Sequence, residues 1–495
     1  MSTGPNKPTG IDKARGLKEI PRAKVPKRPV DERVRDWHEV EGSRNPAELR
    51  LQASRCMDCG VPFCHKGCPL GNYIPDWNHL VHEGDWRAAA ARLHDTNNFP
   101  EFTGRTCPAP CEQSCVLNIN TDAVTIKQIE RHIIDRAWEQ GWVEPRPAQR
   151  KTGHKVAVVG SGPAGMAAAQ QLARAGHEVT VFERDDRVGG LLRYGIPGFK
   201  MAKEHIDLRV RQMEAEGVSF VTGVALGSDR SLQELRAEFE VVLLAVGAKK
   251  ARELPIPGRE LEGIYPAMDY LVRQNHLNAG DEVADPIDAG GRRVLILGGG
   301  DTGADCLGTA HRQEAAEVRQ FEILPKPPEV RDEDRPWPWW PMVLRTSSAH
   351  EEGGVRDWSV LTKRFVGDSQ GRVQRLELVR VQWVDGENGR KQMHEIPGSA
   401  FELEADLVLL AIGFTGVTDE WTDDRSGVSI TRRGTIEVDE DYQTSIPGVY
   451  ACGDATRGAS LVVWGIWEGR EAARCIDLAL TGNSRLRTLP NPRPL

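Results

Sequence analysis

The 495-residue sequence has no long apolar run, no excess of basic residues and few cysteines outside one short segment. The longest apolar stretches, VVLLAVGA and DLVLLAI, are far shorter than the ~20 residues that span a bilayer, so we expect no membrane segment. The N-terminus, MSTGPNKPTG, lacks the apolar core of a secretory signal, which favours a cytoplasmic protein. A formal net charge of −8 argues against a nucleic-acid-binding protein, because such proteins carry a basic surface.

Cysteine is concentrated near the front of the chain. Seven of the ten cysteines lie between positions 56 and 115, and only Cys306, Cys452 and Cys475 follow. Cytosolic thiols stay reduced, and disulfide frameworks belong to small secreted chains, so a disulfide knot is disfavoured. The length and a 39% hydrophobic content indicate a globular protein of roughly three domains.

The character of the sequence changes near residue 150. Residues 1–150 are predicted to form helices separated by loops rich in Cys, Pro and Gly. Two strand–glycine–helix segments then begin at residues 155 and 292, and each is followed by an apolar strand that ends in glycine. This pattern predicts an α/β protein with two Rossmann-like dinucleotide-binding domains after a mainly helical domain. The expected divisions are 1–150, 151–290, 291–414 and 415–495.

The first glycine motif comprises Gly160, Gly162 and Gly165, directly after a strand and at the start of a helix. The first glycine permits the turn, the second lets a pyrophosphate approach, and the third lets the helix pack on the strand. The phosphates then lie at the helix N-terminus, where free N–H groups favour negative charge. Glu183 ends the next strand, where a carboxylate can bind ribose hydroxyls. We therefore expect a dinucleotide site here.

A distant segment indicates which dinucleotide binds. In GVYACGDA, Gly453 and Asp454 end a strand. The pairing of this segment with the first motif resembles the two-dinucleotide flavoprotein reductases, in which the Asp contacts the ribityl–phosphate region of the flavin. By this resemblance the first site, formed by 151–290 and 415–495, holds FAD. Gly190, Leu191 and Arg193 of RVGGLLRYGIP are expected beside it.

The second motif repeats the pattern at Gly298, Gly300 and Gly303, with Asp301 and Thr302 between the last two glycines. The same steric reasoning predicts that residues 291–414 bind a second dinucleotide. Transfer of a hydride between two bound cofactors requires no protein acid or base, so we expect no catalytic side chain.

Cations surround the expected ribose end of the second site. The expected ribose-binding acid is missing: the next strand contains Glu322 but is followed by Lys326 and Arg331. Arg312 lies on the preceding helix, with Arg319 just beyond it. Cations here would neutralise a 2′-phosphate, which favours NADPH over NADH. The alternative for each of them is ordinary solvated surface charge.

The cysteines follow a C-x2-C-x4-C-x3-C-P pattern, and a later segment, CPAPCEQSC, supplies three more. This spacing is close to the bacterial ferredoxin run, in which the fourth cysteine ligates the other cluster. Zinc is the main alternative because C-x2-C pairs are common in zinc sites. A neighbouring flavin favours iron–sulfur clusters, which carry electrons. Two [4Fe–4S] clusters need eight ligands, so one ligand would not be a cysteine.

These features together resemble the family of small (β) subunits of bacterial NADPH-dependent glutamate synthase over essentially the whole chain. The resemblance is carried by the cysteine pattern, both glycine motifs and the segments PKPPEVR, RPWPWWPMVLRTSSAHEEGG, VLTKRF and GDATRGASLVVWGIWEGR. It implies that the chain passes electrons from NADPH through FAD and its clusters to a large subunit with glutaminase and FMN sites. It also implies a hetero-oligomer in which this chain alone makes no glutamate.

The N-terminal module also resembles part of dihydropyrimidine dehydrogenase, which implies a ligand set for each cluster. Carried over by position, one cluster takes Cys56, Cys59, Cys64 and Cys115. The other takes Cys68, Cys107 and Cys111, together with Glu130 where that relative has glutamine. An anionic ligand should lower the reduction potential of the second cluster, because net charge tunes it.

Two other functions stay open. One is an NADPH oxidoreductase of the same module family with another acceptor, such as ferredoxin, sulfide or a pyrimidine-type partner. The other is a zinc-stapled, non-catalytic nucleotide sensor. Flavin and iron–sulfur absorption that NADPH bleaches would exclude the sensor.

Overall fold

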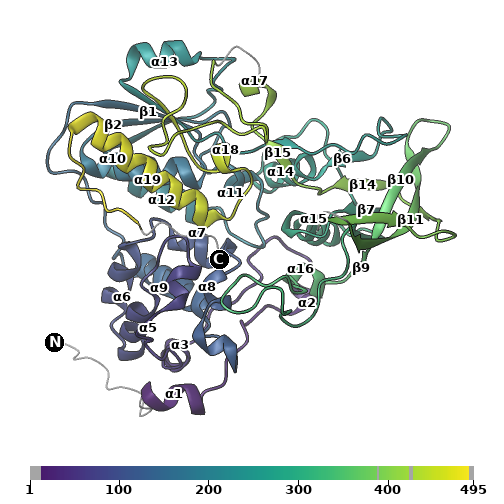
Figure 1. Cartoon of the computed structure of the whole chain (residues 1–495), viewed down its shortest axis with the longest axis horizontal. Coiled ribbons are helices and arrows are strands. Elements are labelled where there is room, and N and C mark those ends of the chain that lie inside the picture. Colours follow the sequence, from purple (N-terminus) through teal and green to yellow (C-terminus); the bar gives the residue numbers. More distant parts are fainter. Residues whose placement is uncertain (1–12, 387–389, 423–426, 490–495) are drawn as a thin grey trace.

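The computed structural model describes residues 13–386, 390–422 and 427–489, so the N-terminal segment considered above as a signal lies outside it. The chain forms a helical unit and two units built on parallel sheets (Figure 1). None of the helices in the described ranges has the length and apolarity needed to cross a bilayer.

Short, well-capped helices make up the N-terminal unit. The Asn45 side chain accepts a hydrogen bond from Ala47 N at one helix start, and Asp85 does the same for Ala88 N at another. Gly84 ends a helix in the left-handed conformation that glycine adopts readily. The elements are α1 (Lys13–Glu19), α2 (Val30–Arg33), α3 (Pro46–Ala53), α4 (Phe63–Gly67), α5 (Ile74–Glu83), α6 (Trp86–His94), α7 (Pro100–Thr106), α8 (Pro110–Gln113), η1 (Val116–Ile119) and α9 (Ile126–Glu139).

The first sheet has the order β16-β4-β1-β2-β3, and every pair in it is parallel. Its strands are β1 (Lys155–Val159), β2 (Glu178–Phe182), β3 (Val218–Val221), β4 (Val241–Leu244) and β16 (Val449–Ala451). Its helices are α10 (Pro163–Ala175), α11 (Leu191–Tyr194), α12 (Glu204–Ala215), α13 (Leu232–Glu238), α18 (Asp454–Arg457) and α19 (Val462–Thr481). The C-terminal helix α19 packs closely on α10, because Gly469 has no Cβ to meet the Ala164 carbonyl.

The second sheet repeats this plan in the order β6-β14-β7-β8-β9, again parallel throughout. Its strands are β6 (Ile264–Pro266), β7 (Arg293–Leu297), β8 (Glu317–Glu322), β9 (Val355–Trp358) and β14 (Leu407–Leu410), with helices α14 (Ala267–Asn278), α15 (Asp301–Arg312) and α16 (Ser348–Glu351). Because β6 and α14 precede residue 291, the second unit begins earlier than the predicted boundary.

An antiparallel sheet, absent from our predictions, is inserted between β9 and β14. It contains β10 (Val360–Gly367), β11 (Val373–Asp385), β12 (Lys391–Glu395) and β13 (Phe401–Glu404), and lies at the right of Figure 1. Two short strands, β5 (Lys250–Ala251) and β15 (Phe414–Gly416), pair where the chain crosses between the parallel sheets, and α17 (Asp419–Thr422) follows. The predicted fold class, a helical domain followed by two Rossmann-like domains, is confirmed.

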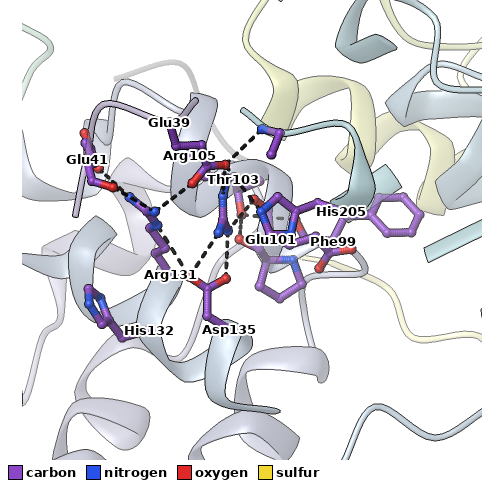
Figure 2. Close-up of polar contacts among 12 residues, drawn as sticks. Glu39, Glu41, Phe99, Glu101, Thr103, Arg105, Arg131, His132, Asp135 and His205 are labelled. Atoms are coloured by element: carbon purple, nitrogen blue, oxygen red, sulfur yellow. Dashed lines mark hydrogen bonds and ion pairs between the residues drawn. The ribbon is translucent and has the colours of Figure 1, made fainter. Parts of the chain in front are cut away.

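Residues 25–44 form a strap that ties the three units together. Arg33 donates to Glu352 and to the Ser348 carbonyl beside α16, in the second nucleotide unit. The Glu39 carboxylate pairs with Arg105 and Arg131 of the helical unit. It also pairs with His205 of the first nucleotide unit, and Figure 2 shows the carboxylate between these partners. The strap therefore fixes how the nucleotide units sit against the helical unit.

Candidate functional site

The three glycines of the first motif each have a distinct steric role. Gly160 has φ +98°, and a Cβ there would stand 2.4 Å from the Ala245 carbonyl oxygen. A Cβ on Gly165 would stand 2.0 Å from the Gly160 carbonyl oxygen, so the helix could not approach the strand. Gly162, in contrast, opens onto a cavity, with nothing within 4 Å of its ideal Cβ. The open side of Gly162 leaves room for a pyrophosphate at the start of α10.

The carboxylate of Glu183 is held beside this loop. It accepts hydrogen bonds from the backbone N–H and the hydroxyl of Ser161, and from Asp185 N at 3.0 Å. The cavity also reaches Gly190, Leu191 and Asp454. Burial raises the pKa of Asp454 to about 6, although the Ser460 hydroxyl donates to it at 2.6 Å. A glycine cradle with carboxylates placed for sugar hydroxyls fits FAD.

Two residues expected beside the flavin, Gly453 and Arg193, do not line the cavity but stabilise segments that do. Gly453 N donates to Glu468 at 2.8 Å, which fixes the strand end before Asp454. The guanidinium of Arg193 is buried and binds the Val188 carbonyl and Asp207. Arg193 therefore braces the loop and does not line the cavity.

The second motif reproduces the same geometry. A Cβ on Gly298 would stand 2.2 Å from the Ala411 carbonyl oxygen, and one on Gly303 would stand 2.4 Å from the Gly298 carbonyl oxygen. Gly300 has nothing within 4 Å of its ideal Cβ, and it lines a large cavity together with Asp301. Thr302 follows within the first turn of α15.

Glu322 corrects one inference from the sequence. It ends β8, and its carboxylate accepts hydrogen bonds from Gly299 N at 2.8 Å and Leu324 N at 3.0 Å. Glu183 accepts from Ser161 and Asp185 in the same way. An acid is therefore present at the ribose position of the second site. The cations that follow Glu322 in the sequence made its correspondence to Glu183 difficult to recognise.

The second cavity has a volume of about 1060 Å³ and contains cations that the sequence analysis did not select. Arg356 on β9 lines it, and among the described residues no acid forms an ion pair with this guanidinium. Burial lowers the pKa of Arg356. Arg345 also lines the cavity, with its guanidinium 4.0 Å from the Trp340 ring centroid. Arg356 is on the strand beside β8, a pairing that a single sequence does not reveal.

The predicted phosphate-binding cations fall into different places. Arg312 is wrong as a ligand: it ends α15, roughly 16 Å from the N-terminus of that helix, and its fully buried guanidinium pairs with Glu352 at 2.7 Å. Arg331 donates to the Trp339 and Gln113 carbonyls, outside the cavity. Lys326 lies exposed at the rim, between two prolines that line the cavity, and stays a prediction.

The seven N-terminal cysteines separate into two small cavities. One cavity is lined by Cys56, Cys59, Cys64 and Cys115. The other is lined by Cys68, Cys107 and Cys111, together with Glu130. No three His, Cys, Asp or Glu side chains in the described ranges are spaced as ligands of a single metal ion. The grouping is the one that the resemblance implied, with four candidate ligands at each cavity.

Burial disfavours negative charge on these candidate ligands. It raises the pKa of Cys56 and Cys68 to about 11 and that of Cys107 to about 12. Such thiols become thiolates when a bound cation supplies positive charge, which is the chemistry of cluster ligands. The set of donors therefore fits two iron–sulfur clusters.

Glu130 is oriented through one of its two carboxylate oxygens. Thr103 Oγ1 donates to Oε1 at 2.6 Å, and Asn97 Nδ2 donates to Oε1 at 3.0 Å. Burial raises the pKa of Glu130 to about 7. Within the described residues Oε2 has no recorded hydrogen bond, and the side chain lines the cavity of Cys68, Cys107 and Cys111. Oε2 is therefore the atom available as a fourth ligand.

The four cavities adjoin one another. Val462 lines the flavin cavity, and the next residue, Val463, lines the cavity of Cys68. Ile74 and Ile126 then line both cysteine cavities. Leu461 lines the flavin cavity as well as the large second cavity. Cys107, Pro110 and Lys127 line both the large second cavity and the cavity of Cys68, so shared or neighbouring residues connect all four sites.

A tryptophan-rich loop of the second nucleotide unit, residues 335–342, packs against residues beside the cavity of Cys115. Trp337 packs on Phe63, which lines that cavity, with ring centroids 4.5 Å apart. Its indole N–H donates to the Cys115 carbonyl at 3.2 Å. Ser114 donates to the Pro338 carbonyl at 3.1 Å.

Comparison with known proteins agrees with this architecture. Residues 154–469 match the pyridine nucleotide-disulphide oxidoreductase family, and residues 33–142 match dihydropyrimidine dehydrogenase domain II, 4Fe-4S cluster. The chain is 57% identical to the glutamate synthase [NADPH] small chain of Mycobacterium tuberculosis, over 95% of this chain and 96% of that one. It is 46% identical to a glutamate synthase [NADH] of Schizosaccharomyces pombe, over 96% of this chain but only 23% of that one.

A solved structure, Mycobacterium tuberculosis FprA in complex with NADPH, has the same fold across 67% of this chain and 85% of its own, with a TM-score of 0.54 and 20% identity. The glutamate synthase [NADPH] small chain of Bacillus subtilis is 45% identical over 96% of this chain and its whole length. The chain therefore belongs to the family of glutamate synthase small chains, flavoprotein oxidoreductases with an N-terminal iron–sulfur domain.

Proposed function

We propose that this chain is the electron-input subunit of an NADPH-dependent glutamate synthase. It oxidises NADPH and delivers the electrons to a large subunit that forms L-glutamate from L-glutamine and 2-oxoglutarate. When bound, FAD takes a hydride from NADPH and releases electrons singly, and iron–sulfur clusters accept single electrons. The observation that carries the proposal is the set of adjoining cavities, which connects the second nucleotide site, the flavin site and both groups of cysteines.

The residues that hold each nucleotide follow from the two glycine loops. Gly162 and Gly300 would admit the pyrophosphates of FAD and NADPH, and Glu183 and Glu322 would bind the ribose hydroxyls. Arg356 is the best candidate for the 2′-phosphate, because it lines the cavity without an acid partner in the described structure. A bound phosphate would supply the missing negative charge.

We further propose two [4Fe–4S] clusters, held in the two cysteine cavities. The cavity of Cys68, with Glu130, adjoins the flavin site through Val463, so a cluster held there would be the first acceptor of electrons from the flavin. The cavity of Cys59 lies beyond it, so a cluster held there would be the one that serves the partner. Short distances between successive sites are what single-electron transfer requires, and the shared lining residues support them.

We propose that the partner docks where the outer cysteine cavity, which is lined by Cys56, Cys59, Cys64 and Cys115, meets the surface. Met57, Val61 and Ile119 are exposed there, with 43%, 57% and 51% of their surface accessible. All three belong to segments that carry the outer cysteines. In the Schizosaccharomyces pombe relative the matched region is part of one longer chain, which supports a large partner for this one. We propose that this partner carries the glutaminase and FMN sites.

The test combines metal analysis with reduction by NADPH. The purified chain should contain one FAD, about eight iron atoms and about eight sulfides, and NADPH should bleach both the flavin and the iron–sulfur absorption. Cys59→Ala and Cys68→Ala should each remove about half of the iron. Addition of the large subunit, glutamine and 2-oxoglutarate should yield glutamate. A protein with zinc in place of iron, or full physiological turnover without a large subunit, would overturn the proposal.

A matched pair of variants locates the docking face. Val61→Glu places a charge on the proposed face, and Val221→Glu places one on an exposed valine of β3, in the FAD unit. V61E should retain NADPH-dependent bleaching but lose most glutamate formation with the large subunit. V221E should retain both activities. Equal loss in the two variants would argue against the face.

A further inference from the structure

A separate basic cavity lies at the junction between the helical unit and the FAD unit. Its volume is about 180 Å³, roughly that of six water molecules in liquid water. Its walls come from α6 and α9, from the linker at residues 142–146, and from α10 and α12. None of the cofactor sites described above shares a lining residue with it.

Guanidinium groups dominate the charge of this cavity. Arg87, Arg146, Arg174 and Arg209 line it, and Glu144 is the acid on its wall. This concentration of positive charge contrasts with the net charge of −8 for the whole chain. Glu144 pairs with Arg87 at 3.6 Å, so this acid offsets one of the four cations.

The counter-ions of Arg174 and Arg209 do not line the cavity. Arg209 pairs with Glu101, at 2.7 Å, and both side chains are fully buried. Arg174 pairs with the buried Glu216 at 2.6 Å. Neither Glu101 nor Glu216 lines the cavity. These pairs hold two guanidinium groups rigidly at the base of the cavity.

Arg146, which is exposed, and a neutral His94 complete the lining. The Arg146 guanidinium forms no recorded ion pair or hydrogen bond in the described part of the chain, although its backbone N–H binds Glu216. His94 directs Nδ1 at the Ala90 carbonyl and faces Arg209 with Nε2, 3.4 Å from a guanidinium nitrogen. Burial, then the charges of Arg209 and its neighbours, lowers the pKa of His94 to about 3, so the ring is neutral.

The remaining walls are apolar. Ala90, Ala91, Ala137, Val143 and Pro145 line the space between the arginines, together with Trp142. A purely inorganic anion would leave this surface uncovered, whereas a short carbon chain with a terminal carboxylate would cover it. We propose that the cavity binds a small dicarboxylate of about five carbons, which bridges the helical and FAD units.

Calorimetric titration of the cofactor-loaded chain with glutarate tests this proposal. Arg146→Gln should weaken glutarate binding at least tenfold, because a charged hydrogen bond is lost and the guanidinium has no structural partner. Arg150→Gln, an exposed arginine of the same linker outside the cavity, should leave the affinity unchanged. Higher ionic strength should weaken binding to the wild-type chain.

A second variant separates binding from folding. Ala91 is exposed and lines the cavity, so Ala91→Leu should fill the space, preserve the helix and abolish glutarate binding. Inorganic phosphate is the comparison ligand and should bind at least tenfold more weakly than glutarate. Equal affinities in the wild type, R146Q and A91L, or phosphate binding as tight as glutarate, would overturn the proposal.

Discussion

Replacement of Glu39 by glutamine should loosen the junction between the units. The Glu39 side chain is 15% exposed, and its carboxylate binds Arg105 and Arg131 of the helical unit, each at 2.7 Å. It also accepts from Ala202 N at 3.0 Å and pairs with His205 at 3.3 Å, both in the FAD unit (Figure 2). Removal of one partner from a buried charge network costs about 3–5 kcal/mol.

The lower end of that range applies here, because both arginines keep another acid. Arg105 keeps Asp135, and Arg131 keeps Glu41. A loss of about 3 kcal/mol corresponds to a fall in Tm of roughly 6–12 °C for a unit of 150–250 residues. The fall in Tm is measured by thermal unfolding of the cofactor-loaded chain, monitored by circular dichroism. The matched control is Glu41→Gln, since Glu41 is 32% exposed and its single ion pair is worth about 0–1 kcal/mol.

The pH dependence gives a second check on the same reasoning. Burial raises the pKa of Glu39, but the hydrogen bond with His205 and the charges of Arg105 and Arg131 outweigh it and hold the pKa well below its usual range. The stabilisation is therefore present above pH ~4.3, the unfolded value, and is lost as the pH falls. The difference in Tm between wild type and E39Q should narrow below pH 4. Equal losses of Tm in E39Q and E41Q would refute this account of Glu39. A difference in Tm between wild type and E39Q that is the same at all pH values would also refute it.

Five further substitutions test the cofactor sites. Arg356→Gln should raise KM for NADPH by about 10–100-fold and leave KM for NADH unchanged, because a charged contact to the 2′-phosphate is lost. The control Arg319→Gln, on β8, should change neither KM value. Glu130→Gln should raise the midpoint potential of one cluster in a redox titration and leave the other unchanged, since an anionic ligand becomes neutral. Gly165→Ala should lower both the Tm and the FAD content, because its Cβ would meet the Gly160 carbonyl. Gly162→Ala should lower the FAD content alone, because nothing lies within 4 Å of its ideal Cβ. A G162A protein that still contains a full complement of flavin would contradict the role given to Gly162.

Features that depend on local backbone geometry were predictable from the sequence. Both glycine motifs predicted their strand–turn–helix units, because the need for each glycine arises within a few residues. The mainly helical N-terminal unit was likewise predicted. The inserted sheet of β10–β13 was not, because its antiparallel pairings join segments far apart and no short motif marks them.

Features that depend on long-range partners were harder to predict. Arg312 and Arg356 look alike in the sequence, yet Glu352 neutralises the former, and among the described residues no acid pairs with the latter. Glu322 was discounted because of the cations after it, although it occupies the position of Glu183. The grouping of the cysteines came from a family resemblance, since spacing alone does not determine which of them share a cavity.

The Trp337 contacts give the nucleotide unit a mechanical connection to the far end of the electron path. The loop that carries this indole starts from the second nucleotide sheet, yet it packs on Phe63, which lines the outer cysteine cavity, and touches the backbone of Cys115. Rotation of the nucleotide unit as a rigid body must either break this hydrogen bond or pull on the segment that carries Cys115. A movement of the nucleotide unit therefore reaches the wall of the outer cysteine cavity through one tryptophan.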